Sequence, residues 1–352
     1  MKPFVHQALA SRVVFGAGSL QQLGQEIDAL GATRALVLCT PEQADSARRV
    51  AELLGERAAG IFPKAVMHVP IETAREARAE GRRLGADCAV AIGGGSTTGL
   101  GKAIALDSGL PIIAIPTTYA GSEMTSIYGL TEAGVKKTGR DLRVLPRTVI
   151  YDPELSLSLP IGLTVTSGLN AIAHAAEGLY AFDGNPIVSL MAEEGIRAIA
   201  AALPRLLVAP TDVDARGDAL YGAWLCGVVL GAVSMGLHHK LCHTLGGSFN
   251  LPHAEVHTVV LPHALAYNEA HAPEAMRRIA QALGHESAAA GLFDLAQRLG
   301  APVALKTIGM PADGLDRAAD LAVQTPYPNP RPLERAAIRE LLQRAFDGER
   351  PR

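Results

Sequence analysis

The sequence predicts an α/β domain with a parallel sheet over residues 1–153, followed by an all-helical domain over residues 154–352. Three observations support this division. At 352 residues the chain is longer than a single hydrophobic core usually serves. Up to Pro153, short apolar runs alternate with amphipathic segments, which is typical of β-α-β units. After Pro153 the chain becomes rich in Ala, Leu and Gly, with few β-branched runs, which favours helices.

The elements of the first half follow from apolar runs of four to six residues that end in or next to Gly, Pro, Thr or Asp. Such runs are typical of buried parallel strands. Two amphipathic stretches, 44–54 and 71–84, lie between the runs and predict helices. The predicted strands are ALVL (35–38), AVAIGGG (89–95), PIIAIPTT (111–118) and TVIYDP (148–153).

The second half contains seven segments with helical periodicity and no internal repeat. The Pro-rich stretch 324–332 predicts an ordered loop before the last helix. The predicted helices span 168–181, 187–207, 215–237, 273–283, 288–299, 314–323 and 333–346.

Composition excludes several classes of protein. Charged residues make up 19% of the chain and the net charge is −3, which argues against disorder and against binding nucleic acid through a basic surface. Four separated cysteines without a C-x-x-C pair, and a first segment without a sustained apolar run, predict a cytoplasmic protein. The uncharged stretch 219–237 approaches the length of a membrane span, but its four glycines and the following histidines favour a buried helix, so no membrane partner is expected.

The segment AIGGGSTTGLGKAIA (91–105) places three glycines between an apolar strand and a helical pattern. Glycines let a backbone approach a pyrophosphate, and the amides of the following helix favour its negative charge. The spacing fits neither the G-x-G-x-x-G pattern nor the Walker pattern. We therefore expect an unusual phosphate-binding turn, with a glycine-rich turn that binds nothing as the alternative.

Six of the eleven histidines lie between His238 and His263. His239 and His243 are four residues apart on a helical stretch, as are Asn170 and His174, so each pair shares a helix face. His253 follows a turn and could fold back toward them as a loop residue. We expect the set to converge on a metal or an anionic substrate, although any one of these histidines could be a structural core residue. His238, His257 and His263 are expected to be supporting or structural.

The chain resembles the iron-containing alcohol dehydrogenase family over almost its full length. The resemblance is carried by FGAGSL (15–20), GGGS (93–96), PTTYAGSE (116–123), GVKK (134–137), DPELSLSLP (152–160), GLNAIAHAAE (168–177) and HKLCHTLGG (239–247) followed by Pro252 and His253. Within the family, PTTYAGSEMTSIYG and the histidine-rich segment look like the maleylacetate reductases.

The resemblance implies a dehydroquinate synthase-like fold, with an NAD(P)H-binding α/β domain and a helical catalytic domain. It implies that Gly93, Gly94, Gly95 and Ser96 hold the pyrophosphate. It also implies that Thr117, Thr118 and Ser122 line the nucleotide cleft, and that Lys136 reaches the cofactor. A homodimer is expected on the same ground.

Two positions depart from the family pattern. Metal-dependent members supply one aspartate and three histidines; His174, His239 and His253 match the histidines, but Asn170 stands at the aspartate position. Loss of the anionic ligand weakens a divalent-cation site and frees the histidines to be protonated, so we expect no metal. Thr40 stands where an acid often contacts the adenosine ribose, so both NADH and NADPH are expected to serve.

The departures suit a dicarboxylate substrate. Maleylacetate carries a carbon-carbon double bond conjugated to a ketone, and hydride addition to that bond produces an enolate, which protonation converts to 3-oxoadipate. The reaction needs an enolate stabiliser and a proton donor. We assign proton donation or enolate stabilisation to His243, and binding of the dianion to His239 and His253; His174, Asn170 and Lys240 complete the predicted pocket.

Three alternative functions are also compatible with parts of the sequence. A metal-dependent alcohol or polyol dehydrogenase of the same family would show bound iron or zinc. A lyase resembling dehydroquinate synthase would want an anionic zinc ligand, which Asn170 does not provide. A catalytically silent nucleotide-binding protein would leave the histidine set without a purpose.

Overall fold

The computed structural model describes residues 4–9, 11–132 and 135–351, and it divides into two compact units. One unit comprises residues 8–159, and the other comprises residues 160–352 together with residues 1–7. The first unit thus ends at Leu159, a short distance beyond the predicted boundary at residue 153. The turn Pro153–Ser156 belongs with the sheet, since the preceding Asp152 accepts hydrogen bonds from the backbone N–H groups of Gly18 and Leu20.

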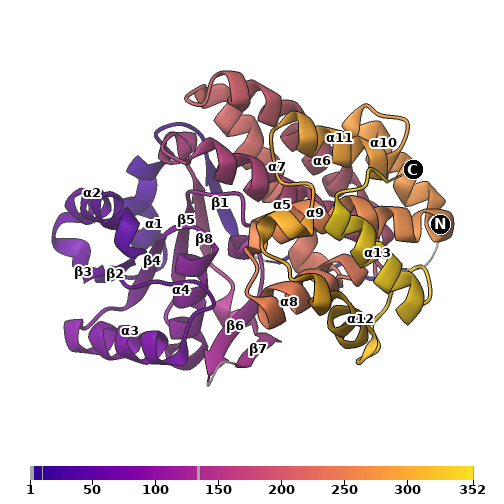
Figure 1. Ribbon diagram of the computed structural model, residues 1–352. Helices are drawn as coiled ribbons and strands as arrows, with labels where there is room; N and C mark the ends of the chain where they lie inside the picture. The colour runs from indigo at the N-terminus through magenta and orange to yellow at the C-terminus, as the bar shows by residue number, and fades with distance from the viewer. Residues whose placement is uncertain (1–3, 10, 133–134, 352) are drawn as a thin grey trace. The chain divides into compact units, whose positions relative to one another are not determined.

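The first unit is built on a six-stranded sheet in which all strand pairs are parallel, with the order β1-β8-β5-β4-β2-β3 (Figure 1). The predicted strands are present, most of them one to three residues shorter than expected. The strands are β1 (Arg12–Phe15), β2 (Ala35–Leu38), β3 (Ala58–Phe62), β4 (Cys88–Gly93), β5 (Ile112–Pro116) and β8 (Thr148–Tyr151); a separate antiparallel hairpin pairs β6 (Ile127–Glu132) with β7 (Val135–Arg140).

Helices cover both faces of the sheet because successive side chains of each buried strand point to opposite faces. In β2, Val37 packs with α1 (Leu23–Ala29) and α2 (Ala44–Leu54), whereas Leu38 packs with α3 (Ile71–Leu84) and α4 (Gly95–Ser108). Burial on both faces explains the continuous apolar runs that predict these strands.

The second unit is entirely helical in its described part. Its helices are α5 (Ile161–Tyr180), α6 (Pro186–Val208), α7 (Val213–Ala232), α8 (Leu237–Phe249), α9 (His253–Asn268), α10 (Pro273–Leu283), α11 (Ala288–Arg298), α12 (Leu315–Val323) and α13 (Arg335–Asp347). The predicted loop before the last helix is confirmed, since residues 324–332 contain neither helix nor strand.

Two expectations about this unit are wrong. The helix predicted over 215–237 ends at Ala232, and α8 begins at Leu237 in a new direction, bent by 96°. Two carboxylates stabilise this break by accepting freed backbone N–H groups: Asp183 from Ser234, and Glu177 from Gly236. His253, expected in a loop, is the first residue of α9.

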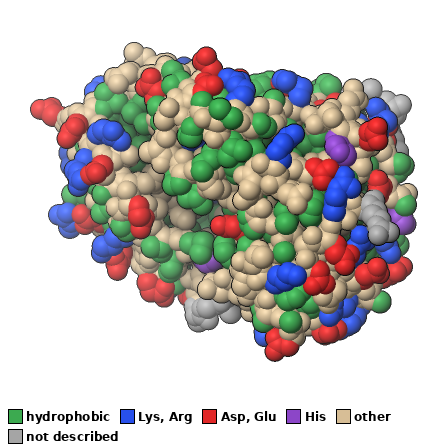
Figure 2. Space-filling view, turned by 45° about the horizontal axis from the view of Figure 1, so that its top comes forward, with side chains coloured by type: hydrophobic (Ala, Val, Ile, Leu, Met, Phe, Trp, Pro, Cys, Tyr) green, Lys and Arg blue, Asp and Glu red, His purple; other side chains and the backbone are tan. Residues whose placement is uncertain are grey.

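No single helix of the described chain is long and apolar enough to cross a membrane; by length and composition alone, the bent pair α7 and α8 passes that test. On the face drawn in Figure 2, basic and acidic side chains are interspersed, and neither sign forms an extended patch.

Candidate active site

The glycine turn joins β4 to the N-terminus of α4, as the sequence predicts. Gly93 has a φ of +149°, and a Cβ there would lie 2.5 Å from side-chain oxygens of Gln43 and Thr97. A Cβ on Gly94 would lie 3.0 Å from Oγ1 of Thr118. A side chain is therefore excluded at Gly93 and would be crowded at Gly94. Gly94, Gly95 and Ser96 stay partly exposed.

This turn fits the pyrophosphate of a dinucleotide. Helix α4 begins at Gly95, and no side chain caps its first amides, which leaves them available to an anion. The hydroxyl oxygen of Thr97, in the first turn of α4, is buried and has no hydrogen-bond partner among the described residues.

The segment after β5 lies against the turn. Thr117 donates its backbone N–H to the Gly93 carbonyl (3.1 Å), and its Oγ1 accepts a hydrogen bond from Nε2 of Gln43 (2.8 Å). The other residues predicted for the nucleotide site lie in four places. Thr118 faces Gly94, and Ser122 begins a short 3₁₀ turn. Thr40 follows β2, precedes the 3₁₀ turn Pro41–Gln43 and hydrogen-bonds the Glu42 carboxylate. Lys136 lies in β7, and its side chain is outside the described part of the structure.

Lys102 is a buried cation near this segment that sequence reasoning did not single out. Its ammonium donates to the carbonyls of Ser122 (2.6 Å) and Ile127 (2.7 Å) and to Oγ1 of Thr125 (2.9 Å). Burial lowers the pKa of Lys102 to about 7, against the opposing effect of the Glu123 carboxylate. Lys102 thus ties α4 to the segment that the sequence assigns to the nucleotide.

In the helical unit, α5, α8 and α9 bring six histidines together. The ring centre of His174 lies 5.1 Å from that of His239, and the ring centre of His257 lies 5.0 Å from that of His239. His253 stands 4.5 Å from His257, and His243 stands 6.2 Å from His239, again between ring centres. The predicted convergence of His174, His239, His243 and His253 in one cluster is therefore present, and His238 and His257 belong to the cluster as well.

The cluster has a buried side and an exposed side. His174, His238, His239 and His257 are buried, whereas His243 and His253 are exposed in their unit. Burial first, and then the neighbouring histidines, lower the pKa of His174 and His257 well below the usual value and that of His238 to about 3. The lowered pKa values favour the neutral form of these three rings at pH 7.

Glu177 is the main residue of this site that sequence reasoning missed. It lies on α5 three residues after His174, so it shares that helix face, and Oε2 of its buried carboxylate lies 2.6 Å from Nδ1 of His239. Burial raises the pKa of Glu177, but the hydrogen bonds from His239 and from the Gly236 amide are among the effects that outweigh it and lower the pKa to about 2. Since an ionised carboxylate only accepts hydrogen bonds, Nδ1 of His239 carries a proton.

His238 and His257 form a second buried contact within the cluster. Nε2 of His238 and Nδ1 of His257 are 2.9 Å apart, and Sγ of Cys242 lies 3.6 Å from Nε2 of His238. His238, expected to be supporting, thus orients His257. His263 shares no described contact with the cluster.

The side chain of Lys240, which is predicted to bind substrate, extends over an aromatic ring. Its Nζ lies 5.9 Å from the centre of the Tyr327 ring.

The open donor atoms of the cluster determine how well it could hold a metal ion. Asn170 Oδ1, His174 Nδ1, His239 Nε2 and His257 Nε2 are buried without a hydrogen-bond partner among the described residues. Imidazole nitrogens suit a divalent transition metal, and a carboxylate behind a ligating histidine is a common arrangement. The Glu177 carboxylate is turned to Nδ1 of His239, and the open atoms named above are all neutral donors. They fit a weakly held cation, with Asn170 supplying a neutral oxygen; His253, which the resemblance assigns to the metal, is exposed in its unit.

Comparison with known proteins gives consistent matches. Residues 10–153 match the family described as iron-containing alcohol dehydrogenase, and residues 164–346 match the C-terminal part of the Fe-containing alcohol dehydrogenase family. The chain is 73% identical over 351 residues to maleylacetate reductase of Burkholderia cepacia, covering 100% of both chains, and 60% identical to that of Sphingobium indicum, covering 99% of both. It is similar to the crystal structure of maleylacetate reductase from Agrobacterium tumefaciens, with a TM-score of 0.97, 58% identity and 100% of both chains covered.

Proposed function

The chain belongs to the iron-containing alcohol dehydrogenase family, and we propose that it acts as a maleylacetate reductase, which uses NADH or NADPH to reduce the carbon-carbon double bond of maleylacetate to 3-oxoadipate. Within the site, the proposal depends on one observation: a cluster of six histidines in which an amide, Asn170, takes the place of the anionic metal ligand. An alcohol dehydrogenase of this family needs a Lewis acid on the oxygen of its substrate, whereas conjugate reduction needs hydrogen-bond donors on an enolate.

The cofactor, when bound at the glycine turn, supplies the hydride. The proposed work of the turn is to hold its pyrophosphate, with Thr118 packed against Gly94 and Lys102 fixing the segment that carries Thr117 and Ser122. Absence of an acid at Thr40 supports use of both NADH and NADPH.

In the helical unit, His243 is the proposed proton donor to the carbon next to the ketone, or the hydrogen-bond donor to the enolate oxygen. Its exposure supports this role, since a substrate can reach it. His253, also exposed, is proposed to bind a carboxylate of the dianion, and His239 is proposed to present Nε2 to the substrate from a ring oriented by Glu177. His174 and Asn170 line the site as neutral groups.

We propose that the reaction does not require a metal. The neutral donor set supports this, because a cation on three imidazoles and an amide is held less tightly than one with a carboxylate ligand. If an ion binds His174, His239 and His253, the chemistry it supplies is polarisation of a substrate oxygen.

The remaining proposals concern the setting of the enzyme. We propose a small dicarboxylate as its partner, and neither nucleic acid nor membrane. Four free, buried cysteines support a reducing compartment, which we take to be the cytoplasm. A homodimer is proposed on the family resemblance, and β1 at the edge of the sheet offers one surface for it.

The deciding experiment measures NADH consumption with maleylacetate, with 3-oxoadipate identified as the product, in the presence and absence of a chelator. We expect turnover in both. No reaction with maleylacetate, combined with iron-dependent oxidation of a simple alcohol or diol, would instead identify the metal-dependent dehydrogenase.

A further inference from the structure

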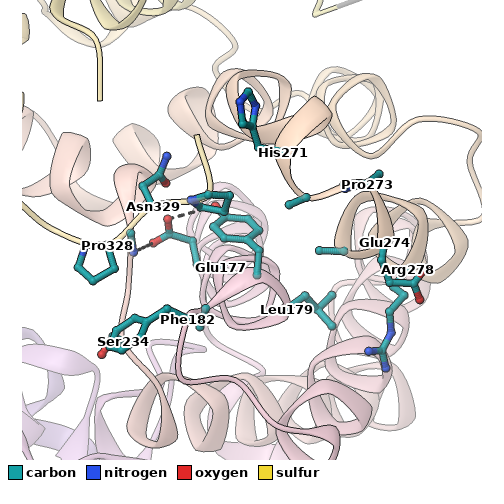
Figure 3. A pocket seen from close by; sticks show the side chains of 16 residues that line it. Glu177, Leu179, Phe182, Ser234, His271, Pro273, Glu274, Arg278, Pro328 and Asn329 are labelled. Atoms are coloured by element: carbon teal, nitrogen blue, oxygen red, sulfur yellow. Dashed lines mark hydrogen bonds between the residues drawn. The ribbon is translucent and has the colours of Figure 1, made fainter. Parts of the chain in front are cut away.

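The carboxylate of Glu177 is surrounded by five hydrogen-bond donors. Oε2 accepts from Nδ1 of His239 (2.6 Å) and from the backbone N–H groups of Gly236 (3.1 Å) and His239 (3.2 Å). Oε1 accepts from the backbone N–H of His238 (3.0 Å) and from the hydroxyl of Tyr180 (3.1 Å). Figure 3 shows Glu177 among the residues that line a cavity of about 570 Å³.

This arrangement determines which nitrogen of His239 faces the histidine cluster. Nδ1 points to the carboxylate, so Nε2 is the nitrogen turned to the other side of the ring. Nε2 of His239 is buried and has no hydrogen-bond partner among the described residues, as expected of an atom that awaits a ligand. The rings nearest to His239 are those of His257 and His174, with centres 5.0 Å and 5.1 Å from its own.

From this geometry we infer that Glu177 is a positioning residue of the reductase, which fixes the ring orientation and the protonated Nδ1 of His239 so that Nε2 meets the substrate. This inference rests on the proposed function for the identity of the substrate. It adds a residue to the working site that neither touches the substrate nor was expected from the sequence.

A purely architectural role for Glu177 would be to cap α8. The N-terminus of α8 already has a second acceptor, because Oδ1 of Asn329 accepts from the backbone N–H of Leu237 (3.3 Å). The shortest contact of Glu177 is to the imidazole, not to a backbone amide. A charged acceptor at this distance orients a histidine strongly.

The experiment compares Glu177→Gln with Tyr180→Phe. Glu177→Gln replaces one carboxylate oxygen with an NH₂ group, which cannot accept the hydrogen bonds that this oxygen accepts. Tyr180→Phe removes one donor and leaves the carboxylate hydrogen-bonded to His239. We expect Glu177→Gln to lower kcat/KM for maleylacetate about 10- to 100-fold, the usual effect of losing a residue that orients a working histidine. We expect Tyr180→Phe to lower it by less than about threefold, and NADH affinity to stay unchanged in both variants.

A double-mutant cycle separates positioning from capping. If Glu177 acts through His239, then adding Glu177→Gln to His239→Ala changes the dissociation constant of the product, 3-oxoadipate, by less than about threefold, because the residue it orients is already absent. Independent losses from the two substitutions would overturn the inference, as would a folded Glu177→Gln enzyme with normal kcat/KM.

A spectroscopic measurement on the unaltered protein needs neither turnover nor a variant. Nitrogen-15 NMR of labelled histidines should show a proton on Nδ1 of His239. A bare Nδ1 overturns the inference whether or not maleylacetate is the substrate. Failure of the unaltered enzyme to reduce maleylacetate would refute the proposed function, and a protonated Nδ1 would still support the orientation of His239.

Discussion

At the scale of single residues, the chemically identical side chains of the histidine cluster differ in burial and in their neighbours. His238 and His257 are buried and neutral, and they pair with each other. His243 and His253 are exposed and can meet a substrate. The environment thus separates buried, neutral histidines from exposed ones, and the proposed supporting and catalytic roles follow this difference, much as burial and neighbours separate the roles of paired acids in other enzymes.

The first prediction concerns His243. Replacement by Ala should lower kcat for maleylacetate reduction about 100-fold or more, a usual size for loss of a general acid or a charge-stabilising donor, with little change in NADH binding. Replacement of His253 by Ala is the matched contrast and should act more on KM.

Steady-state kinetics and a melting curve for each variant test this assignment together. A His243→Ala enzyme that melts earlier but turns over at the normal rate would mean that His243 only packs α8.

A second prediction concerns Asn170. Prolonged EDTA treatment should leave turnover nearly intact, because the donor set lacks an anionic ligand, and Asn170→Asp should increase the iron or zinc retained after purification. Metal content by elemental analysis, measured beside activity, checks both parts. Activity that is lost on chelation and restored by iron or zinc would contradict the prediction.

At the scale of elements, breaks in regular structure supply the working surfaces. Strand β4 ends at a glycine turn where α4 begins with uncapped amides. The apolar stretch that starts as α7 breaks at Val233, and α8 begins with its amides on Glu177. Unpaired amides at a helix N-terminus attract an anion, which is the proposed cofactor phosphate at the first break and the Glu177 carboxylate at the second.

A third prediction tests the first of these breaks. Gly94→Val should raise the dissociation constant of NADH at least about tenfold, since a side chain there would meet Thr118 and fill the space of the pyrophosphate. Gly101→Ala is the control, because it lies further along α4, outside the turn, and its Cβ would lie at an ordinary 3.5 Å from Cγ2 of Ile112.

Fluorescence titration with NADH measures both constants. Equal affinities in the unaltered protein and a folded Gly94→Val variant would remove the cofactor from this turn.

At the scale of the whole molecule, each unit has its own hydrophobic core, and the helical unit also buries neutral histidines. A buried histidine with a lowered pKa affects stability in one direction. Between its folded and unfolded pKa values, the unfolded chain binds a proton that the folded chain does not, so the free energy of unfolding falls as pH falls. His238 and His263 should have this effect in the window from pH 6.5 down to about 3 and about 4 respectively.

A fourth prediction follows for acid stability. The free energy of unfolding should decrease steadily from pH 7 to pH 5, and each such histidine contributes a slope of up to about 1.4 kcal/mol per pH unit. His263 is the residue to test, because it lies outside the site and burial lowers its pKa to about 4. His263→Gln should reduce this slope by the contribution of one proton, up to about 1.4 kcal/mol per pH unit. Denaturant unfolding at several pH values measures the slope, and an unchanged slope would show that His263 does not contribute.

The sequence by itself determined the features that depend on neighbouring residues along the chain. Apolar runs bounded by breakers located β2, β4, β5 and β8, because strands buried on both faces must be apolar throughout. Three glycines before a helical pattern located the turn, and spacing of four residues put His239 and His243 on one face of α8.

Only the tertiary structure decided which distant residues meet. The edge strands β1 and β3 are apolar but only four and five residues long, too short for their pattern alone to identify them, and their place is set by the strands they pair with. Nothing in the sequence around Glu177 shows that α8 will begin at its carboxylate, or that His257 will lie against His238. Contacts between separate helices depend on how whole apolar faces pack, and that packing is a property of the complete fold, not of any one segment.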